Sequence, residues 1–173
     1  MGPRVRGKDA VILIGMPGAG KSTVGVLLAK ALSCEFVDTD VLIQAREGRR
    51  LQVILDREGR ARFCAIEEQY LVSLDLGNVV VATGGSAVYS ERAMNHLKGK
   101  GVAVYLQLPY PELEQRLSDL GSRGVVMEQG QSLRHLYHER VPLYERYADI
   151  TVACSGLRHE HVVEAILREL DRY

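Results

Sequence analysis

The 173-residue sequence has no tryptophan, few cysteines and no excess of charge of either sign. The three cysteines, Cys34, Cys64 and Cys154, are odd in number and far apart, and none belongs to a CxxC pair. A disulfide framework or a zinc site is therefore not expected, and the pattern fits a reducing cytosol. The 22 basic and 22 acidic residues cancel, which argues against binding nucleic acid or anionic membranes through bulk charge.

The sequence also lacks a long hydrophobic run. The first apolar stretch, Ala10 to Ile14, is too short for a signal peptide or a membrane span. No internal repeat or linker is present, and 173 residues correspond to one domain. We therefore expect a single cytoplasmic domain over residues 1–173 that acts as a monomer on a small molecule, without nucleic-acid or membrane partners.

Apolar β-rich runs alternate with amphipathic segments along the chain. Strands are expected at 10–14, 35–37, 78–82, 102–106 and 150–152. Helices are expected at 22–32, 41–47, 52–76, 90–97, 110–120, 133–147 and 159–170, with breaks near Gly48 and Gly59. This alternation predicts an α/β fold with a parallel sheet between helices. Ligands of such sheets bind at the carboxyl ends of the strands, so the residues that follow each strand are candidate site residues.

The segment after the first strand, GMPGAGKST at 15–23, fits the pattern G-x-x-x-x-G-K-[ST] in full. Glycines let the backbone approach an anion closely, and the amides of the following helix start supply partial positive charge. Lys21 adds a full charge for the phosphates, and the Ser22 hydroxyl can ligate Mg²⁺. A glycine-rich turn that only caps a helix is the alternative. We predict nucleotide binding by Gly15, Gly18, Ala19, Gly20, Lys21, Ser22 and Thr23.

Two carboxylates, Asp38 and Asp40, follow the second strand. One can hold Mg²⁺ through water, and the other can accept the proton of a substrate hydroxyl. The simpler explanation is that Thr39 or Asp40 only caps the next helix. The two roles are compatible.

Three further segments give weaker signals. The Gly84–Gly85 turn after the third strand lets backbone N–H groups approach a small ligand, or serves only as a tight turn. Arg123 lies in a glycine-rich segment at about 119–131 that we interpret as a mobile lid, where a guanidinium neutralises charge on a transferred phosphoryl group. A solvated loop arginine is the alternative. Arg140 precedes Pro142, and a kink there aims Arg140 into the cleft or leaves it on the surface.

Together, GMPGAGKST, VDTD, the Gly-Gly turn, the single-arginine lid and RVPLY resemble the shikimate kinase family. The resemblance runs in register from about Val11 to Leu170, nearly the whole chain. It implies a three-layer α/β/α P-loop kinase fold with five parallel strands in the order 2-3-1-4-5. It also implies Mg²⁺-dependent transfer of the γ-phosphate of ATP to the 3-hydroxyl of shikimate.

The same resemblance implies roles at the phosphate end of the site. Lys21 would contact the phosphates, and Ser22 and Asp38 would serve Mg²⁺. Asp40 would hold the attacking hydroxyl, and Arg123 would be the lid arginine.

It also implies roles at the substrate and base ends. Gly84 and Gly85 would line the substrate site, and Arg140 would bind the substrate carboxylate. Arg116 matches an arginine that packs on adenine, and Arg158 lies where the family has its adenine loop.

Two positions depart from the family pattern. Cys64 stands where the family has an arginine that binds the substrate carboxylate, and Ser86 stands where it has a third glycine. Loss of one charge-assisted partner costs about 1.5–3 kcal/mol, or ten- to a hundredfold in binding. Arg60 lies four residues before Cys64, on the same helix face unless Gly59 starts the helix. We expect Arg60, Cys64 and Ser86 to line the substrate pocket, with a substrate-binding helical region at about 41–76.

Two other functions remain open. One is a kinase for another small, anionic, hydroxylated metabolite, and the other is a nucleotide-binding module without a phosphoryl acceptor. The nucleotide-binding module is disfavoured because the chain keeps all the side chains that the reaction needs: Lys21, Ser22, Asp38, Asp40 and Arg123. A nucleoside monophosphate kinase is disfavoured because base recognition needs more binding surface. The five histidines form no recognisable triad or ligand set, and we assign them no chemistry.

Overall fold

The computed structural model describes residues 7–120, 127–128 and 130–173, so Arg123 and most of the predicted lid lie outside the described residues. Five parallel strands form one sheet in the order β2-β3-β1-β4-β5, which confirms the expected fold class and strand order. The strands are β1 (Ala10–Ile14), β2 (Glu35–Asp38), β3 (Val79–Ala82), β4 (Gly101–Gln107) and β5 (Ile150–Ala153).

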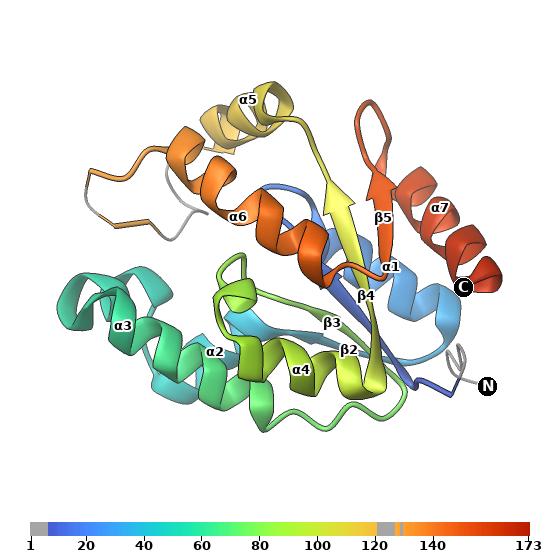
Figure 1. Cartoon of the computed structure of the whole chain (residues 1–173), viewed down its shortest axis with the longest axis horizontal. Coiled ribbons are helices and arrows are strands. Elements are labelled where there is room, and N and C mark those ends of the chain that lie inside the picture. Colours follow the sequence, from blue (N-terminus) through green and yellow to red (C-terminus); the bar gives the residue numbers. More distant parts are fainter. Residues whose placement is uncertain (1–6, 121–126, 129) are drawn as a thin grey trace.

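Helices cover both faces of this sheet (Figure 1). They are α1 (Lys21–Leu32), α2 (Thr39–Glu47), α3 (Leu51–Val72), α4 (Glu91–Lys100), α5 (Tyr110–Leu120), α6 (Leu133–Tyr147) and α7 (His159–Arg172), with a short 3₁₀ turn η1 (Ala87–Tyr89). Helix α1 packs beside α7, whereas α4 packs beside α3 and α6 lies over β4. Within the described residues, no helix combines the length and the apolar character needed to cross a membrane.

The central strands explain why the apolar runs are continuous. Every residue of β1 is buried, because β1 lies between β3 and β4 and helices cover both of its faces. A strand that is covered on both faces has no solvent side, so its apolar residues do not alternate with polar ones. The edge strand β5 alternates buried and exposed residues instead.

Helices α2 and α3 differ from the prediction at their ends. Helix α2 begins at Thr39 because the Asp38 side chain caps it. Helix α3 ends at Val72, four residues before the predicted end, and Gly59 interrupts it with φ 77° and ψ 170°. A positive φ of this kind is accessible to glycine without strain. The break gives α3 two halves, and the second half begins at Arg60.

Buried side chains of α2 and α3 form a small separate core. Its buried members are Ile43, Leu51, Ile54, Leu55, Phe63 and Ile66. The main core, built on the sheet, contains none of these residues. In Figure 1 this helical region projects from the sheet on the side away from α7.

Candidate active site

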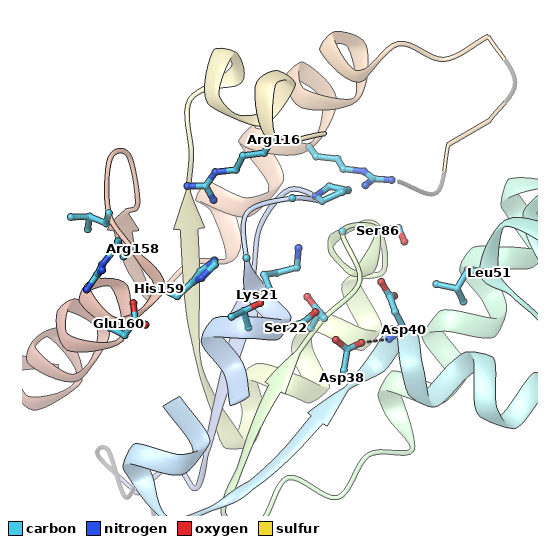
Figure 2. A pocket seen from close by; sticks show the side chains of 18 of the residues that line it. Lys21, Ser22, Asp38, Asp40, Leu51, Ser86, Arg116, Arg158, His159 and Glu160 are labelled. Carbon is cyan, nitrogen blue, oxygen red and sulfur yellow. Dashed lines mark hydrogen bonds between the residues drawn. The ribbon is translucent and has the colours of Figure 1, made fainter. Parts of the chain in front are cut away.

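A cavity of about 860 Å³ lies at the carboxyl ends of the strands. Figure 2 shows Lys21 and Ser22 of α1 gathered in it with Asp38 of β2 and Asp40 of α2. Most of the predicted site residues line this cavity: Gly18, Gly20, Lys21, Ser22, Thr23, Asp38, Asp40, Gly85, Ser86, Arg116, Arg140 and Arg158.

The other predicted residues lie close by. Arg60 and Cys64 line a smaller cavity of about 20 Å³, which shares Ser86 and Arg140 with the larger one. Gly15, Ala19 and Gly84 are not among the lining residues of either cavity.

The phosphate loop joins β1 to α1 through three glycines with positive φ: 147° at Gly15, 81° at Gly18 and 94° at Gly20. Gly20 is the N-cap of α1, and no side chain caps this helix. The first amides of α1 are therefore left for an anion, as at other phosphate-binding helix starts.

The Lys21 ammonium folds back onto the loop that carries it. Its Nζ donates hydrogen bonds to the carbonyl oxygens of Gly15 (2.7 Å) and Met16 (2.9 Å). Burial lowers the pKa of Lys21 to about 8, and the nearby Arg140 acts in the same direction, while Asp40 opposes both. A bound phosphate would place a negative charge beside this ammonium and so favour its charged form.

The two carboxylates of the acidic pair, Asp38 and Asp40, have different surroundings. Asp38 Oδ1 accepts hydrogen bonds from the backbone N–H of Asp40 (3.0 Å) and Val41 (3.2 Å), so the cap of α2 is Asp38. The expectation that Thr39 or Asp40 provides the cap is wrong, because the capping residue must precede the first helical turn. Asp40 instead faces the cavity, where burial raises the pKa of its carboxyl and Lys21 opposes that shift.

Ser22 and Asp38 fit a magnesium site. Both line the same cavity as Lys21, and both carry the hard oxygen donors that Mg²⁺ prefers. Mg²⁺ usually binds through one or two protein ligands, with water and substrate phosphates as the others. The donor set is therefore sufficient when a nucleotide supplies the remaining oxygens.

The Gly-Gly turn is fixed from two sides. The backbone N–H of Gly84 donates to Thr39 Oγ1 (3.0 Å), and Tyr144 OH donates to the Gly85 carbonyl (2.6 Å). A Cβ on Gly84 would lie 2.5 Å from Glu67 Oε1 and 2.6 Å from Asp40 Oδ1, so no side chain fits there. The glycine is required by this close approach.

Ser86 occupies the third position of the turn without strain. Its φ of −90° is ordinary for any residue, so the family's glycine is not needed for backbone conformation here. The side chain brings a hydroxyl group to the wall of the cavity.

Arg140 is the buried cation of the substrate end. It is only 6% exposed, so the alternative of a surface arginine is wrong. Its Nε donates to Tyr89 OH (3.0 Å), and among the described ion pairs none involves Arg140. A buried guanidinium without a carboxylate partner is suited to bind an anionic ligand.

Arg60 stands beside Arg140 but already has acidic partners. Its guanidinium pairs with Glu139, and its Nη1 lies 3.8 Å from Glu128 Oε2. It also lies 4.5 Å above the Tyr89 ring, which Arg140 contacts as well. Cys64, one helical turn further on, is half-buried, and burial raises the pKa of its thiol.

Several lining residues were not anticipated from the sequence: Pro17, Leu51, Phe63, Thr83, His159 and Glu160. Figure 2 places His159 on the side of Lys21 opposite to Asp40. Its Nε2 would lie 3.0 Å from a Cβ on Gly20, so this histidine stands next to the phosphate loop. The available signal was its position after the last strand, at a helix start.

Glu67 is the most informative residue that sequence analysis missed. It is 2% exposed, and Ser86 Oγ donates to its Oε2 at 2.6 Å. Its Oε1 is buried and has no hydrogen-bond partner among the described residues. Burial raises the pKa of Glu67 to about 7, and the charge of Asp40 adds to this shift, while the Ser86 hydrogen bond opposes it.

Comparison with known proteins gives consistent matches. A family model described as shikimate kinase matches residues 17–171. The shikimate kinase of Thiobacillus denitrificans is 40% identical over 148 residues, which are 84% of this chain and 81% of that protein. That of Aquifex aeolicus is 35% identical over 93% of this chain and 95% of its own. The structure of shikimate kinase from Acinetobacter baumannii in complex with shikimate matches with TM-score 0.85 and 31% identity, over 95% of this chain and 94% of that one.

Proposed function

The chain belongs to the shikimate kinase family, and we propose that it transfers the γ-phosphoryl group of ATP to the 3-hydroxyl of shikimate. The observation that carries this proposal is the single cavity shared by the phosphate loop, the acidic pair and Arg140. Phosphate-binding groups, a candidate base and a carboxylate-binding cation thus face one another across one space.

Asp40 is the residue we assign to the attacking hydroxyl. Its carboxylate accepts the hydroxyl proton as the hydroxyl oxygen bonds to the γ-phosphorus, while the bond to the β–γ bridging oxygen breaks and ADP leaves. Lys21 is held in place by two loop carbonyls and stabilises the charge of the transferred group. We assign the same task to Arg123, which lies outside the described residues. Mg²⁺ bound by Ser22 and Asp38 would neutralise charge on the phosphate oxygens.

The two arginines beside Tyr89 are our candidates for the substrate carboxylate. Arg140 is buried and free of acidic partners within the described chain, which supports the principal role. Arg60 lies next to the same small cavity as Arg140 and Cys64, which supports a secondary role. At the other end of the large cavity, Arg116 and Arg158 are our candidates for the adenine side.

The decisive experiment measures ADP release from Mg-ATP with and without shikimate, through a coupled pyruvate kinase and lactate dehydrogenase reaction. Saturable, shikimate-dependent release supports the proposal, and Lys21→Ala is expected to abolish it. A protein that binds ATP but is not stimulated by shikimate has another acceptor, which a screen of small hydroxy acids would identify. Tight ATP binding without turnover on any metabolite would leave only a nucleotide-binding module.

We further propose that the chain works as one catalytic domain and as a cytoplasmic monomer, without nucleic-acid or membrane partners. The zero formal charge supports the absence of nucleic-acid and membrane partners, and the three free cysteines support the cytoplasmic setting. Size-exclusion chromatography with light scattering checks the monomer, and a dimeric mass would contradict it.

A further inference from the structure

Glu67 and Ser86 form a buried pair at the wall between the two cavities. Ser86 lines both cavities, as does Arg140. The Ser86 hydroxyl is joined to Glu67 Oε2 by a 2.6 Å hydrogen bond. Ser86 therefore lies between the substrate space and a buried carboxyl group, and its hydroxyl can contact both.

The unpartnered oxygen of Glu67 favours a neutral carboxyl. Oε1 is enclosed beside Gly84 and shares that small space with Asp40 Oδ1. A buried oxygen without a hydrogen-bond donor is far less costly on a neutral acid than on a carboxylate. Protonation at Oε2 has a ready acceptor in Ser86 Oγ, whereas protonation at Oε1 has none.

Charged groups on three other helices act on Glu67. Asp40 on α2 favours the neutral form, while Lys21 on α1 and Arg140 on α6 favour the ionised form. On its own helix, Cys64 lies three residues earlier, and Glu67 raises the pKa of that thiol. The balance between burial and these charges gives Glu67 a pKa of about 7.

We propose that Glu67 and Ser86 act as a proton-linked pair that anchors the substrate carboxylate. When Glu67 is neutral, its Oε2–H donates to Ser86 Oγ, and the Ser86 hydroxyl proton turns to the carboxylate held by Arg140. When Glu67 is ionised, it takes the Ser86 proton, and Ser86 presents only lone pairs to the anion. Ser86 is then the binding residue and Glu67 the positioning residue. The inference rests on the proposed function, which supplies the anion.

This pair gives Cys64 and Ser86 a common explanation. An arginine at position 64, three residues before Glu67 on the same helix, would hold the Glu67 carboxylate ionised. The Cys64 thiol carries no such positive charge, so Glu67 can be neutral. A serine at position 86 can accept a hydrogen bond from the neutral carboxyl group, whereas a glycine there cannot. A hydrogen bond from a relayed donor thus takes the place of a guanidinium.

The first test is calorimetric. Shikimate binding to the nucleotide-free protein is measured at about pH 8 in two buffers of different ionisation enthalpy. Wild-type protein is expected to take up close to one proton on binding, because the carboxylate requires the neutral form of Glu67. Glu67→Gln, which has no carboxyl group to protonate, is expected to take up much less than wild type. Equal proton uptake in both proteins, or none in wild type, overturns the proposal.

The second test follows the dissociation constant of shikimate with pH. It is expected to rise about thirtyfold from about pH 6 to about pH 8.5 in wild type, because the free protein has a Glu67 pKa of about 7 and the complex keeps the neutral form. Glu67→Gln should stay near the low-pH value, and Ser86→Ala should be weak throughout. Glu68→Gln is the matched control, since Glu68 accepts from Ser90 Oγ at 2.7 Å in the same way but outside the site. It should keep the wild-type profile.

The two proposals fail in different ways. Wild-type protein that neither binds shikimate nor releases ADP with it refutes the proposed substrate, and the pair falls with it. Normal turnover together with an unchanged pH profile in Glu67→Gln refutes the pair alone.

Discussion

Replacing Arg60 with alanine tests whether a second cation compensates for Cys64. A full charge-assisted hydrogen bond to a carboxylate is worth about 1.5–3 kcal/mol. The Arg60 side chain is 37% exposed and already pairs with Glu139 and Glu128, so its contribution should lie at the low end. We therefore expect Arg60→Ala to raise the KM for shikimate about tenfold, with kcat nearly unchanged.

The assay is the coupled measurement of ADP release over a range of shikimate concentrations at saturating Mg-ATP. Arg62→Ala is the matched control, because Arg62 is 62% exposed and pairs with Glu58 on its own helix. It should leave the KM unchanged. Arg140→Ala should raise the KM more than Arg60→Ala, since Arg140 is buried. An unchanged KM in Arg60→Ala would refute the compensation.

Four other predictions concern stability. A Cβ on Gly101 would meet Ile12 at 2.6 Å and a backbone oxygen at 2.9 Å, so Gly101→Ala should lower the free energy of unfolding by about 1–3 kcal/mol in urea titrations. Gly99→Ala meets nothing within 4 Å and should raise it by up to about 1 kcal/mol. Tyr144→Phe, which leaves the Gly85 carbonyl without its donor, should lower it by about 1–3 kcal/mol. The fourth concerns Glu67, whose pKa is about 7 when folded and 4.5 when unfolded: stability should fall from pH 4.5 to 7 and then level off, and in Glu67→Gln this fall should disappear.

The sheet and the phosphate loop were predictable because their signals are local. The run Ala10–Ile14 is apolar because both faces of β1 are covered, and GMPGAGKST specifies its own turn and helix start. The carboxyl-end rule then identified Asp38 and Asp40 without knowledge of their neighbours. Each of these inferences needed only residues that are close in the sequence.

The remaining features depend on contacts between distant segments. Glu67 is one of many acidic residues in a helical pattern, and only the packing of α3 against the turn after β3 buries it beside Ser86. His159 likewise reaches the phosphate loop only because α7 packs beside α1. The end of α3 at Val72 was placed too late because the apolar pattern continues through Leu74 and Leu76, which pack on the main core without being helical.

The separate core beneath α2 and α3 has a consequence for how this enzyme can diverge. Six buried side chains hold the helical region together, and none of them belongs to the core of the sheet. Local opening of that region therefore needs less free energy than global unfolding. A substitution near the acceptor, such as the cysteine at position 64, therefore destabilises only this small unit. The sheet core that carries the phosphate loop is not affected. Acceptor preference can thus drift over generations while ATP chemistry is inherited intact.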